Sequence, residues 1–276
     1  MTLKQALEKG VQLLEAENIA DAKLDAWYLL SYVSGITRSD YILKQGEELD
    51  ELTLYKYKDV LLKRAQHIPL QHITGEQDFM GFTFWVNEHV LIPRQDTETL
   101  VEEALRVIPS GGHILDLCTG SGCVIISIVA LGQGLSGIGV DISDDALAVA
   151  RENGNRLVPG KVEFVAGDLF NGVSGKFSTI VSNPPYIRTD IIEELEPEVK
   201  DHEPRLALDG TADGLYFYRK IAAEAPQYLL DGGWLLVEIG YDQGRDVAEL
   251  FKQAGFIDVQ IVKDLAGNDR VVTGHL

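Results

Sequence analysis

The first 75 residues show a hydrophobic pattern typical of helices. Apolar residues recur on one helical face between residues 3 and 14, behind a capping box formed by Thr2 and Gln5. Pro69 is expected to end the helical series. These residues predict a small bundle without obvious chemistry of its own. Further helices are expected over 21–35, 39–45 and 52–66.

The period changes to two between residues 76 and 92. Apolar residues alternate from Phe82 to Val86, which predicts a strand with one buried side. A turn is expected at Asn87-Glu88, with a return through Val90. This segment is therefore predicted to be a β-hairpin that links two domains.

From Pro93 onward, helical and strand patterns alternate. This alternation predicts an α/β domain with a mainly parallel sheet covered by helices on both faces. We therefore expect a helical domain over 1–75, a hairpin linker over 76–92 and an α/β domain over 93–276. The expected helices are 96–107, 123–131, 144–156, 215–229 and 245–254, and the seven expected strands are 113–117, 137–141, 162–166, 179–182, 234–239, 259–263 and 270–274.

The charge of the chain bears on its partners. The 276 residues include 24 Lys and Arg against 43 Asp and Glu, and 45% are hydrophobic, as in an ordinary globular protein. Residues 1–75 carry a net charge of −2, whereas residues 76–276 carry −17. Because proteins grip nucleic acid mainly through Lys and Arg, the acidic surface argues against direct nucleic-acid binding and favours a protein partner.

The cellular context follows from what the sequence lacks. Cys118 and Cys123 are too few for a disulfide scaffold and fit no zinc or redox spacing, so we expect packing roles for both. The first ten residues lack the apolar run of a signal peptide, and no stretch approaches the length of a membrane span. We expect a cytoplasmic protein with no membrane association.

Ligands of parallel α/β sheets bind outside the carboxyl ends of the strands. The first such loop here follows the strand 113–117 and reads Asp116-Leu117-Cys118-Thr119-Gly120-Ser121-Gly122. Its glycines allow a tight turn and let a ligand approach the backbone. A strand-to-helix turn needs glycine for geometry alone about as often, so this loop by itself is weak evidence.

Two further strand ends carry carboxylates. Asp141 follows the glycines by about 20 residues, where a carboxylate accepts hydrogen bonds from ribose hydroxyls. Asp168 is placed to accept from an exocyclic amine, and Leu169 to pack on a purine face. Taken singly, each aspartate is more often a helix cap or a surface residue than a ligand-binding group. Their joint placement at successive strand ends favours a nucleoside site.

The fourth loop carries the strongest signal. The strand 179–182 runs into Asn183-Pro184-Pro185-Tyr186. Two prolines fix the backbone and leave carbonyls without a ladder partner, so Asn183 Oδ1 and the Pro184 carbonyl can face one point. Two such acceptors fit a planar NH2 group, and Tyr186 supplies an aromatic face for it. The alternative interpretation is a rigid turn.

These loops together resemble the class I S-adenosylmethionine-dependent methyltransferases, and Asn-Pro-Pro-Tyr resembles the motif of those that methylate a conjugated NH2. Three further segments extend the resemblance to the peptide chain release factor glutamine N5-methyltransferases, the HemK/PrmC family. It covers essentially the whole chain. The segments are Gly75-Glu76-Gln77-Asp78-Phe79-Met80-Gly81, Leu91-Ile92-Pro93-Arg94-Gln95-Asp96-Thr97-Glu98 and Glu203-Pro204-Arg205-Leu206-Ala207-Leu208-Asp209-Gly210.

The resemblance implies a Rossmann-like sheet with an antiparallel last strand, and methyl transfer from S-adenosylmethionine to the glutamine of the Gly-Gly-Gln motif in class I release factors, leaving S-adenosylhomocysteine. No metal is implied, and the helical domain helps to hold the release factor. By position, the methionine end of the cofactor meets Cys118, Thr119, Gly120, Ser121 and Gly122, the ribose meets Asp141, and the adenine meets Asp168 and Leu169. The substrate amide meets Asn183, Pro184, Pro185 and Tyr186, of which Asn183, Pro184 and Tyr186 are the implied catalytic groups; Asn183 also borders the cofactor.

Two positions depart from the family pattern. Cys118 stands where a glycine is usual, and Gln95 where a proline is common. A side chain at position 118 must point away from the cofactor or narrow its pocket. No general base is needed, so we assign no catalytic role to His72, His89, His113 or His202.

Other functions remain open on the residues alone. Adenine N6 is also a conjugated NH2, so the motif suits a nucleic-acid adenine methyltransferase, although a flipped-out base would need basic residues around it. A glutamine of a ribosomal protein would need the same active site. A binding module without catalysis is the third possibility, and the intact Asn-Pro-Pro-Tyr argues against it.

Overall fold

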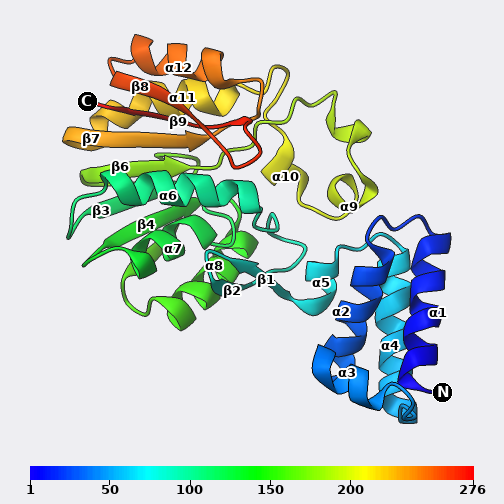
Figure 1. The fold of residues 1–276 in the computed structure, drawn as a ribbon. Helices are drawn as coiled ribbons and strands as arrows, with labels where there is room; N and C mark the ends of the chain where they lie inside the picture. The colour runs from blue at the N-terminus through cyan, green and yellow to red at the C-terminus, as the bar shows by residue number, and fades with distance from the viewer. The chain divides into compact units, whose positions relative to one another are not determined.

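The computed structural model describes residues 1–276 and divides into two compact units. One unit comprises residues 1–75 together with 196–202, and the other comprises 76–195 together with 203–276 (Figure 1). The boundary after Gly75 falls where the hydrophobic period changes from helical to strand-like. The hairpin after this boundary belongs to the larger unit.

The smaller unit is a helical bundle. Its core contains Leu14, Leu29, Leu30 and Tyr57, all of which are fully buried. The expectation that Pro69 ends the helical series is wrong, because a further helix begins directly after it. Proline is tolerated at a helix start, where its missing N–H would have no helical partner. The helices are α1 (Leu3–Ala16), α2 (Ala22–Ser34), α3 (Arg38–Lys44), α4 (Glu51–Ala65), α5 (Leu70–Thr74) and, in the segment 196–202, α9 (Pro197–Lys200).

A buried arginine ties the segment 196–202 to the helices. Arg64 of α4 donates to Asp25 Oδ2 of α2 at 2.7 Å and also pairs with Glu198. A ring nitrogen of His202 lies 3.1 Å from the carbonyl oxygen of Gln66. These polar contacts explain why seven residues from far along the chain join this unit.

The hairpin turns earlier than its pattern suggested. Strand β1 (Glu76–Phe79) pairs antiparallel with β2 (Phe82–Trp85), so the turn is Met80-Gly81 rather than Asn87-Glu88, and Val90 lies outside any strand. Met80 and Gly81 have φ of +50° and +78°. Two successive residues with positive φ form the tight turn that matches the twist of a hairpin.

The larger unit contains the predicted seven-stranded sheet. Its strand order is β5-β4-β3-β6-β7-β9-β8, and only β9 runs antiparallel to its neighbours. The predicted α/β class with an antiparallel last strand is therefore confirmed. The strands are β3 (His113–Leu117), β4 (Ser136–Asp141), β5 (Val162–Ala166), β6 (Phe177–Ser182), β7 (Leu229–Glu238), β8 (Ile257–Lys263) and β9 (Asp269–His275).

Helices and short turns connect these strands. The helix expected over 215–229 ends at Glu224, because Pro226 lacks the N–H that would continue it. The connecting elements are η1 (Gln95–Thr97), α6 (Glu98–Val107), α7 (Cys123–Leu131), α8 (Asp144–Leu157), η2 (Ile192–Glu194), α10 (Arg205–Leu208), α11 (Tyr216–Glu224), η3 (Ala225–Gln227) and α12 (Gly244–Gln253).

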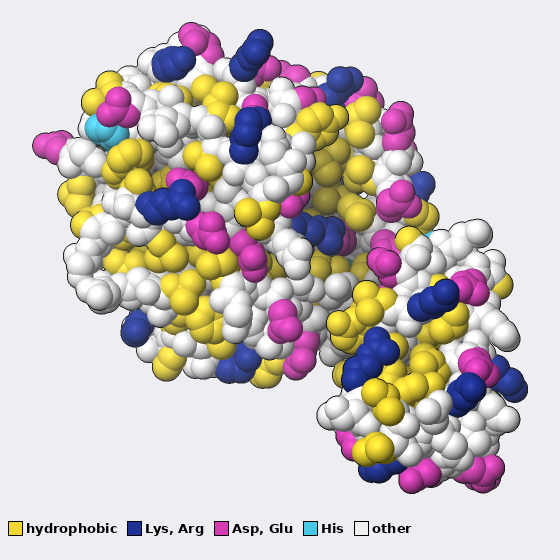
Figure 2. All heavy atoms as spheres, in the orientation of Figure 1, with side chains coloured by type: hydrophobic (Ala, Val, Ile, Leu, Met, Phe, Trp, Pro, Cys, Tyr) yellow, Lys and Arg dark blue, Asp and Glu magenta, His cyan; other side chains and the backbone are white.

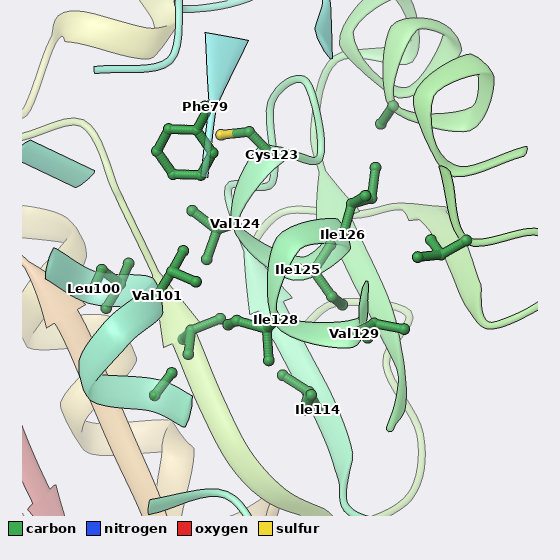
Figure 3. Close-up of a cluster of buried hydrophobic side chains, with 14 of the residues drawn as sticks. Phe79, Leu100, Val101, Ile114, Cys123, Val124, Ile125, Ile126, Ile128 and Val129 are labelled. Atoms are coloured by element: carbon green, nitrogen blue, oxygen red, sulfur yellow. The ribbon is translucent and has the colours of Figure 1, made fainter. Parts of the chain in front are cut away.

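Alternate strand residues enter two hydrophobic clusters on opposite faces of the sheet. One face packs on α6, α7 and α8, and Figure 3 shows Leu100 and Val101 of α6 with the α7 side chains in this cluster, together with Phe79 of the hairpin. The other face packs on α11 and α12, through residues such as Tyr218 and Phe251. Helices thus cover both faces of the sheet, which leaves the ends of the strands as the place for a binding site.

The surface of the larger unit is hollowed on the face drawn in Figure 2, and hydrophobic side chains line the hollow. Acidic and basic side chains are interspersed around it. None of the helices is both long enough and apolar enough to cross a lipid bilayer.

Candidate active site

A cavity of about 290 Å³ opens at the carboxyl ends of β3, β4, β5 and β6. This is the edge at which parallel α/β sheets bind their ligands. Three carboxylates and one arginine line it, namely Asp116, Asp141, Asp168 and Arg94, among mostly apolar neighbours. The cavity lies entirely within the larger unit.

The cavity brings together most of the predicted site residues. Gly122, Pro184 and Tyr186 do not line it, and each lies in the same loops directly behind lining residues. The predicted residues that line it are Cys118, Thr119, Gly120, Ser121, Asp141, Asp168, Leu169, Asn183 and Pro185.

The loop after β3 has an unusual backbone. Cys118 has a φ of +59°, a conformation that costs a residue with a side chain about 1 kcal/mol or more. Its thiol packs at the edge of the buried cluster, and burial raises its pKa. Gly122 serves packing rather than the cavity, because a Cβ there would lie 2.8 Å from Ile126 Cδ1 and 3.3 Å from the Phe164 ring.

Asp141 fixes the glycine loop against the next strand. Its two carboxylate oxygens accept hydrogen bonds from Gly120 N at 2.9 Å and Ser143 N at 3.0 Å. Burial raises the pKa of this carboxyl, and the backbone hydrogen bonds oppose that rise. Each carboxylate oxygen has a second lone pair, so Asp141 retains the capacity to accept from a ligand.

The carboxylate after β5 lies at the mouth of the cavity. Asp168 is half exposed, and its Oδ2 is 3.6 Å from Lys220 Nζ. Leu169, with a φ of +54°, is buried and lines the cavity. An apolar side chain next to an exposed carboxylate suits a flat base with an exocyclic amine.

Asn183 is oriented by a residue from another part of the chain. Its Nδ2 donates to Thr97 Oγ1 at 3.4 Å, and Thr97 is buried and also lines the cavity. Neither Asn183 Oδ1 nor the Pro184 carbonyl oxygen accepts a hydrogen bond from another protein group. With the amide NH2 held by Thr97, Oδ1 is left as a free acceptor.

Tyr186 turns away from the cavity toward a buried carboxyl. Its hydroxyl donates to Glu238 Oε1 at 3.4 Å, and burial raises the pKa of Tyr186. The Tyr186 carbonyl oxygen accepts from Gln243 Nε2 at 3.1 Å. The loop Asn183–Tyr186 is therefore anchored from behind by residues of β7 and the turn that follows it.

The segment from Glu203 to Gly210 borders the same loop. Gly210 has no room for a side chain, because a Cβ there would lie 2.6 Å from Tyr186 Cα. The buried Glu203 pairs with Arg94 at 2.5 Å. Two of the segments that carry the family resemblance are thus joined at the cavity.

Several site residues escaped the sequence analysis as individual candidates. Thr97 and Arg94 lie within the segment 91–98 that carries the family resemblance, but their spacing did not predict a role for either residue. Asp116 and Glu238 are acidic residues at or near strand ends, a signal that could have found them. Burial raises the pKa of both carboxyls to about 7. Gln243 follows its strand by five residues and gave no signal.

The cavity suits S-adenosylmethionine. Gly120 lines it, and no protein atom lies within 4 Å of where a Cβ of this residue would stand. Three carboxylates against one arginine favour a ligand with cationic groups, which the sulfonium and the amine provide. The apolar surface around Leu169 suits the adenine. Asp141 would hold the ribose, and the loop from Cys118 to Ser121 the methionine end.

Comparisons with known proteins bear on the class of this protein. Residues 5–75 match the family described as PrmC N-terminal domain, and residues 95–196 match the family described as Methyltransferase small domain. A methyltransferase structure from Pyrococcus furiosus has a TM-score of 0.53 and 18% identity, and covers 70% of this chain and 87% of its own; it shows the fold alone. Fold and site together define an S-adenosylmethionine-dependent methyltransferase.

Full-length relatives narrow this class. The release factor glutamine methyltransferase of Caulobacter vibrioides is 41% identical over 278 residues, covering 99% of this chain and 96% of the relative. That of Geobacter sulfurreducens is 40% identical over 276 residues, covering 100% and 97%. The chain belongs to the release factor glutamine methyltransferase family.

Proposed function

We propose that this protein transfers a methyl group from S-adenosylmethionine to the side-chain amide nitrogen of the glutamine in the Gly-Gly-Gln motif of class I release factors. The observation that carries this proposal is Asn183, whose NH2 is held by Thr97 while its Oδ1 stays available at the cavity. An acceptor held in this way suits a substrate that offers a planar NH2.

The chemistry required of the protein is orientation. An amide nitrogen is a weak nucleophile, because its lone pair is delocalised into the carbonyl. Two acceptors take hydrogen bonds from its N–H groups, namely Asn183 Oδ1 and the carbonyl oxygen of Pro184, which stands between the lining residues Asn183 and Pro185. These hydrogen bonds return electron density to nitrogen and orient its lone pair. S-adenosylmethionine, when bound, supplies an electrophilic methyl group.

Atoms and charges balance without a protein base. The new bond joins the amide nitrogen to the methyl carbon, and the electron pair of the broken sulfur–carbon bond stays on sulfur. The nitrogen then loses a proton to water. Positioning and exclusion of water supply the acceleration, an effect worth up to about 7–11 kcal/mol in favourable cases.

The helical unit is the proposed docking surface for the release factor. It holds eight of the 17 large hydrophobic side chains that are exposed, although it has little more than a quarter of the residues. It also carries a far smaller share of the negative charge than the rest of the chain. This concentration of exposed apolar side chains in one unit supports a role in protein binding.

Methyl-labelled S-adenosylmethionine tests the proposal. The full chain is incubated with a purified release factor, with its Gly-Gly-Ala variant, with a ribosomal protein fraction and with adenine-containing DNA. We expect label on the wild-type release factor only. Label on DNA or on a ribosomal protein, or label on the Gly-Gly-Ala variant, would contradict the proposed substrate.

A further inference from the structure

The buried carboxyl of Glu238 lies behind the Asn-Pro-Pro-Tyr loop and accepts from Tyr186. Glu238 is the last residue of β7 and is 2% exposed. Its neighbour Val237 pairs with Ser182 in the parallel ladder, so Glu238 and Asn183 leave the sheet at the same edge. One carboxylate oxygen, Oε2, is inaccessible to water and has no hydrogen-bond partner.

Such a group costs stability. Burial raises the pKa of Glu238 to about 7, against the lowering effects of Thr97, Arg270 and Tyr186. Arg270, whose positive charge lowers this pKa, is paired with Asp264 at 3.0 Å and Asp96 at 3.1 Å. A buried polar group kept without full compensation calls for a functional explanation.

The neighbours of Glu238 supply a functional explanation for the buried carboxyl. The hydroxyl of Tyr186, a residue of the substrate loop, donates to Glu238 Oε1 at 3.4 Å. The side chain of Thr97, which accepts from Asn183 of the same loop, lowers the pKa of Glu238 through hydrogen bonding. A threonine hydroxyl that donates to a carboxyl presents its lone pairs elsewhere. The Thr97 oxygen then accepts from the NH2 of Asn183, which leaves Asn183 Oδ1 as the acceptor at the cavity.

We propose that Glu238 is a positioning residue for the methyl transfer, which acts through Thr97 and Tyr186 to hold the Asn183 amide in the orientation that accepts from the substrate NH2. This inference rests on the proposed function. Glu238 does not line the cavity and touches no reacting atom. Its effect is therefore on turnover of the bound complex and not on cofactor binding.

Substitution by a residue of similar size without polar atoms separates this role from a structural one. Glu238→Leu removes the uncompensated carboxyl, so its thermal stability is expected to equal or exceed that of the parent. Its kcat is expected to fall about a hundredfold, as expected when a reacting group loses its orientation. Affinity for S-adenosylhomocysteine should stay within threefold. Glu238→Gln keeps an acceptor oxygen, and its kcat should recover to within tenfold of the parent.

Two further variants guard the interpretation. Thr97→Val removes the hydroxyl through which Glu238 is proposed to act on Asn183. The reductions in kcat caused by Thr97→Val and by Glu238→Leu should therefore not multiply in the double variant. Thr179→Val is the matched control. Thr179 is fully buried and its hydroxyl also lacks a partner, but it stands near the start of β6, four residues before Asn183. Its kcat should be unchanged.

The parent protein is assayed first on the release factor. If it transfers no methyl group, the proposed function fails. If the parent is active, the inference about Glu238 is overturned by any of three results: a kcat within twofold of the parent in a folded Glu238→Leu variant, equal losses in the Leu and Gln variants, or losses that multiply with Thr97→Val. A parallel loss of cofactor affinity would likewise show a structural role.

Discussion

The guanidinium of Arg94 lies 2.5 Å from Oε1 of Glu203, and this ion pair joins the segment before α6 to the segment that precedes α10. Glu203 is buried, whereas Arg94 is 42% exposed. Burial raises the pKa of Glu203, and Arg94 opposes that rise. The arginine therefore offsets the cost of an ionised carboxyl in the interior.

Arg94→Gln should destabilise the fold in a pH-dependent way. A carboxyl whose pKa is higher in the folded than in the unfolded state destabilises the fold once the pH rises above its ordinary pKa. Loss of Arg94 raises the folded-state pKa of Glu203 further, so the destabilisation grows as the pH rises. We expect the free energy of unfolding to fall by about 2 kcal/mol at pH 8 and by a smaller amount at pH 5. The loss at pH 8 is smaller than for a fully buried pair, because Arg94 is partly solvated. Urea denaturation at both pH values measures this.

The control for this prediction is Arg106→Gln. Arg106 pairs with Glu103 on the surface of α6, and its loss should cost less than about 0.5 kcal/mol at either pH. Equal losses for the two arginine variants, or the same loss at pH 5 and pH 8 for Arg94→Gln, would show that Glu203 does not depend on Arg94.

Asn183→Ala should abolish most turnover while leaving the cofactor site intact. The variant removes the acceptor that orients the substrate NH2, and we expect kcat to fall by about a hundredfold or more. The affinity for S-adenosylhomocysteine, measured by calorimetry, should change less than threefold. Turnover near that of the parent would contradict the two-acceptor mechanism.

Cys118→Gly should relieve backbone strain. Because the φ of Cys118 is +59°, glycine is favoured by about 1 kcal/mol, which offsets the lost contacts of the thiol, and the melting temperature should not fall. Removing the side chain also widens the cavity. The matched variant is Cys123→Gly, which places glycine at the first residue of α7 and removes a buried side chain. It should be less stable than the parent, and the opposite order would refute the strain argument.

Gly210→Ala should disturb the substrate loop. Its new methyl group would lie 2.6 Å from Tyr186 Cα, so one of the two backbones must move. We expect at least a tenfold loss of kcat, because displacement of a positioning loop is costly for turnover. Gly46→Ala, where no atom lies within 4 Å of the added Cβ, should leave kcat unchanged. Equal activities in the two variants would show that the loop tolerates the shift.

Leu43→Glu tests the docking role of the helical unit. Leu43 is 83% exposed, so the charge should not unfold the bundle. We expect KM for the release factor to rise at least fivefold with kcat at saturation unchanged. Leu131→Glu is the control, because Leu131 ends α7 at the edge of the sheet opposite the cavity. A rise in KM for both variants, or for neither, would argue against docking on this surface.

The sequence alone determined the class of fold and the loops of the site. Periods of 3.6 and 2 residues are imposed by burial of one face of a helix or strand, so they could be read without coordinates. The residues that line the cavity from Cys118 to Ser121, with Asp141, Asp168 and Asn183, lie at or just after strand ends, because parallel strands bring their carboxyl ends to one edge.

Only the tertiary structure decided what stands behind those loops. The contact of Asn183 with Thr97 spans 86 residues, and that of Tyr186 with Glu238 spans 52. Local periodicity carries no information on such pairs, because they depend on how separate elements pack. The same holds for the tie between Arg64 and Glu198, which brings the segment 196–202 to the helical bundle. Hydrophobic pattern fixes which residues are buried, and packing fixes which buried polar groups meet.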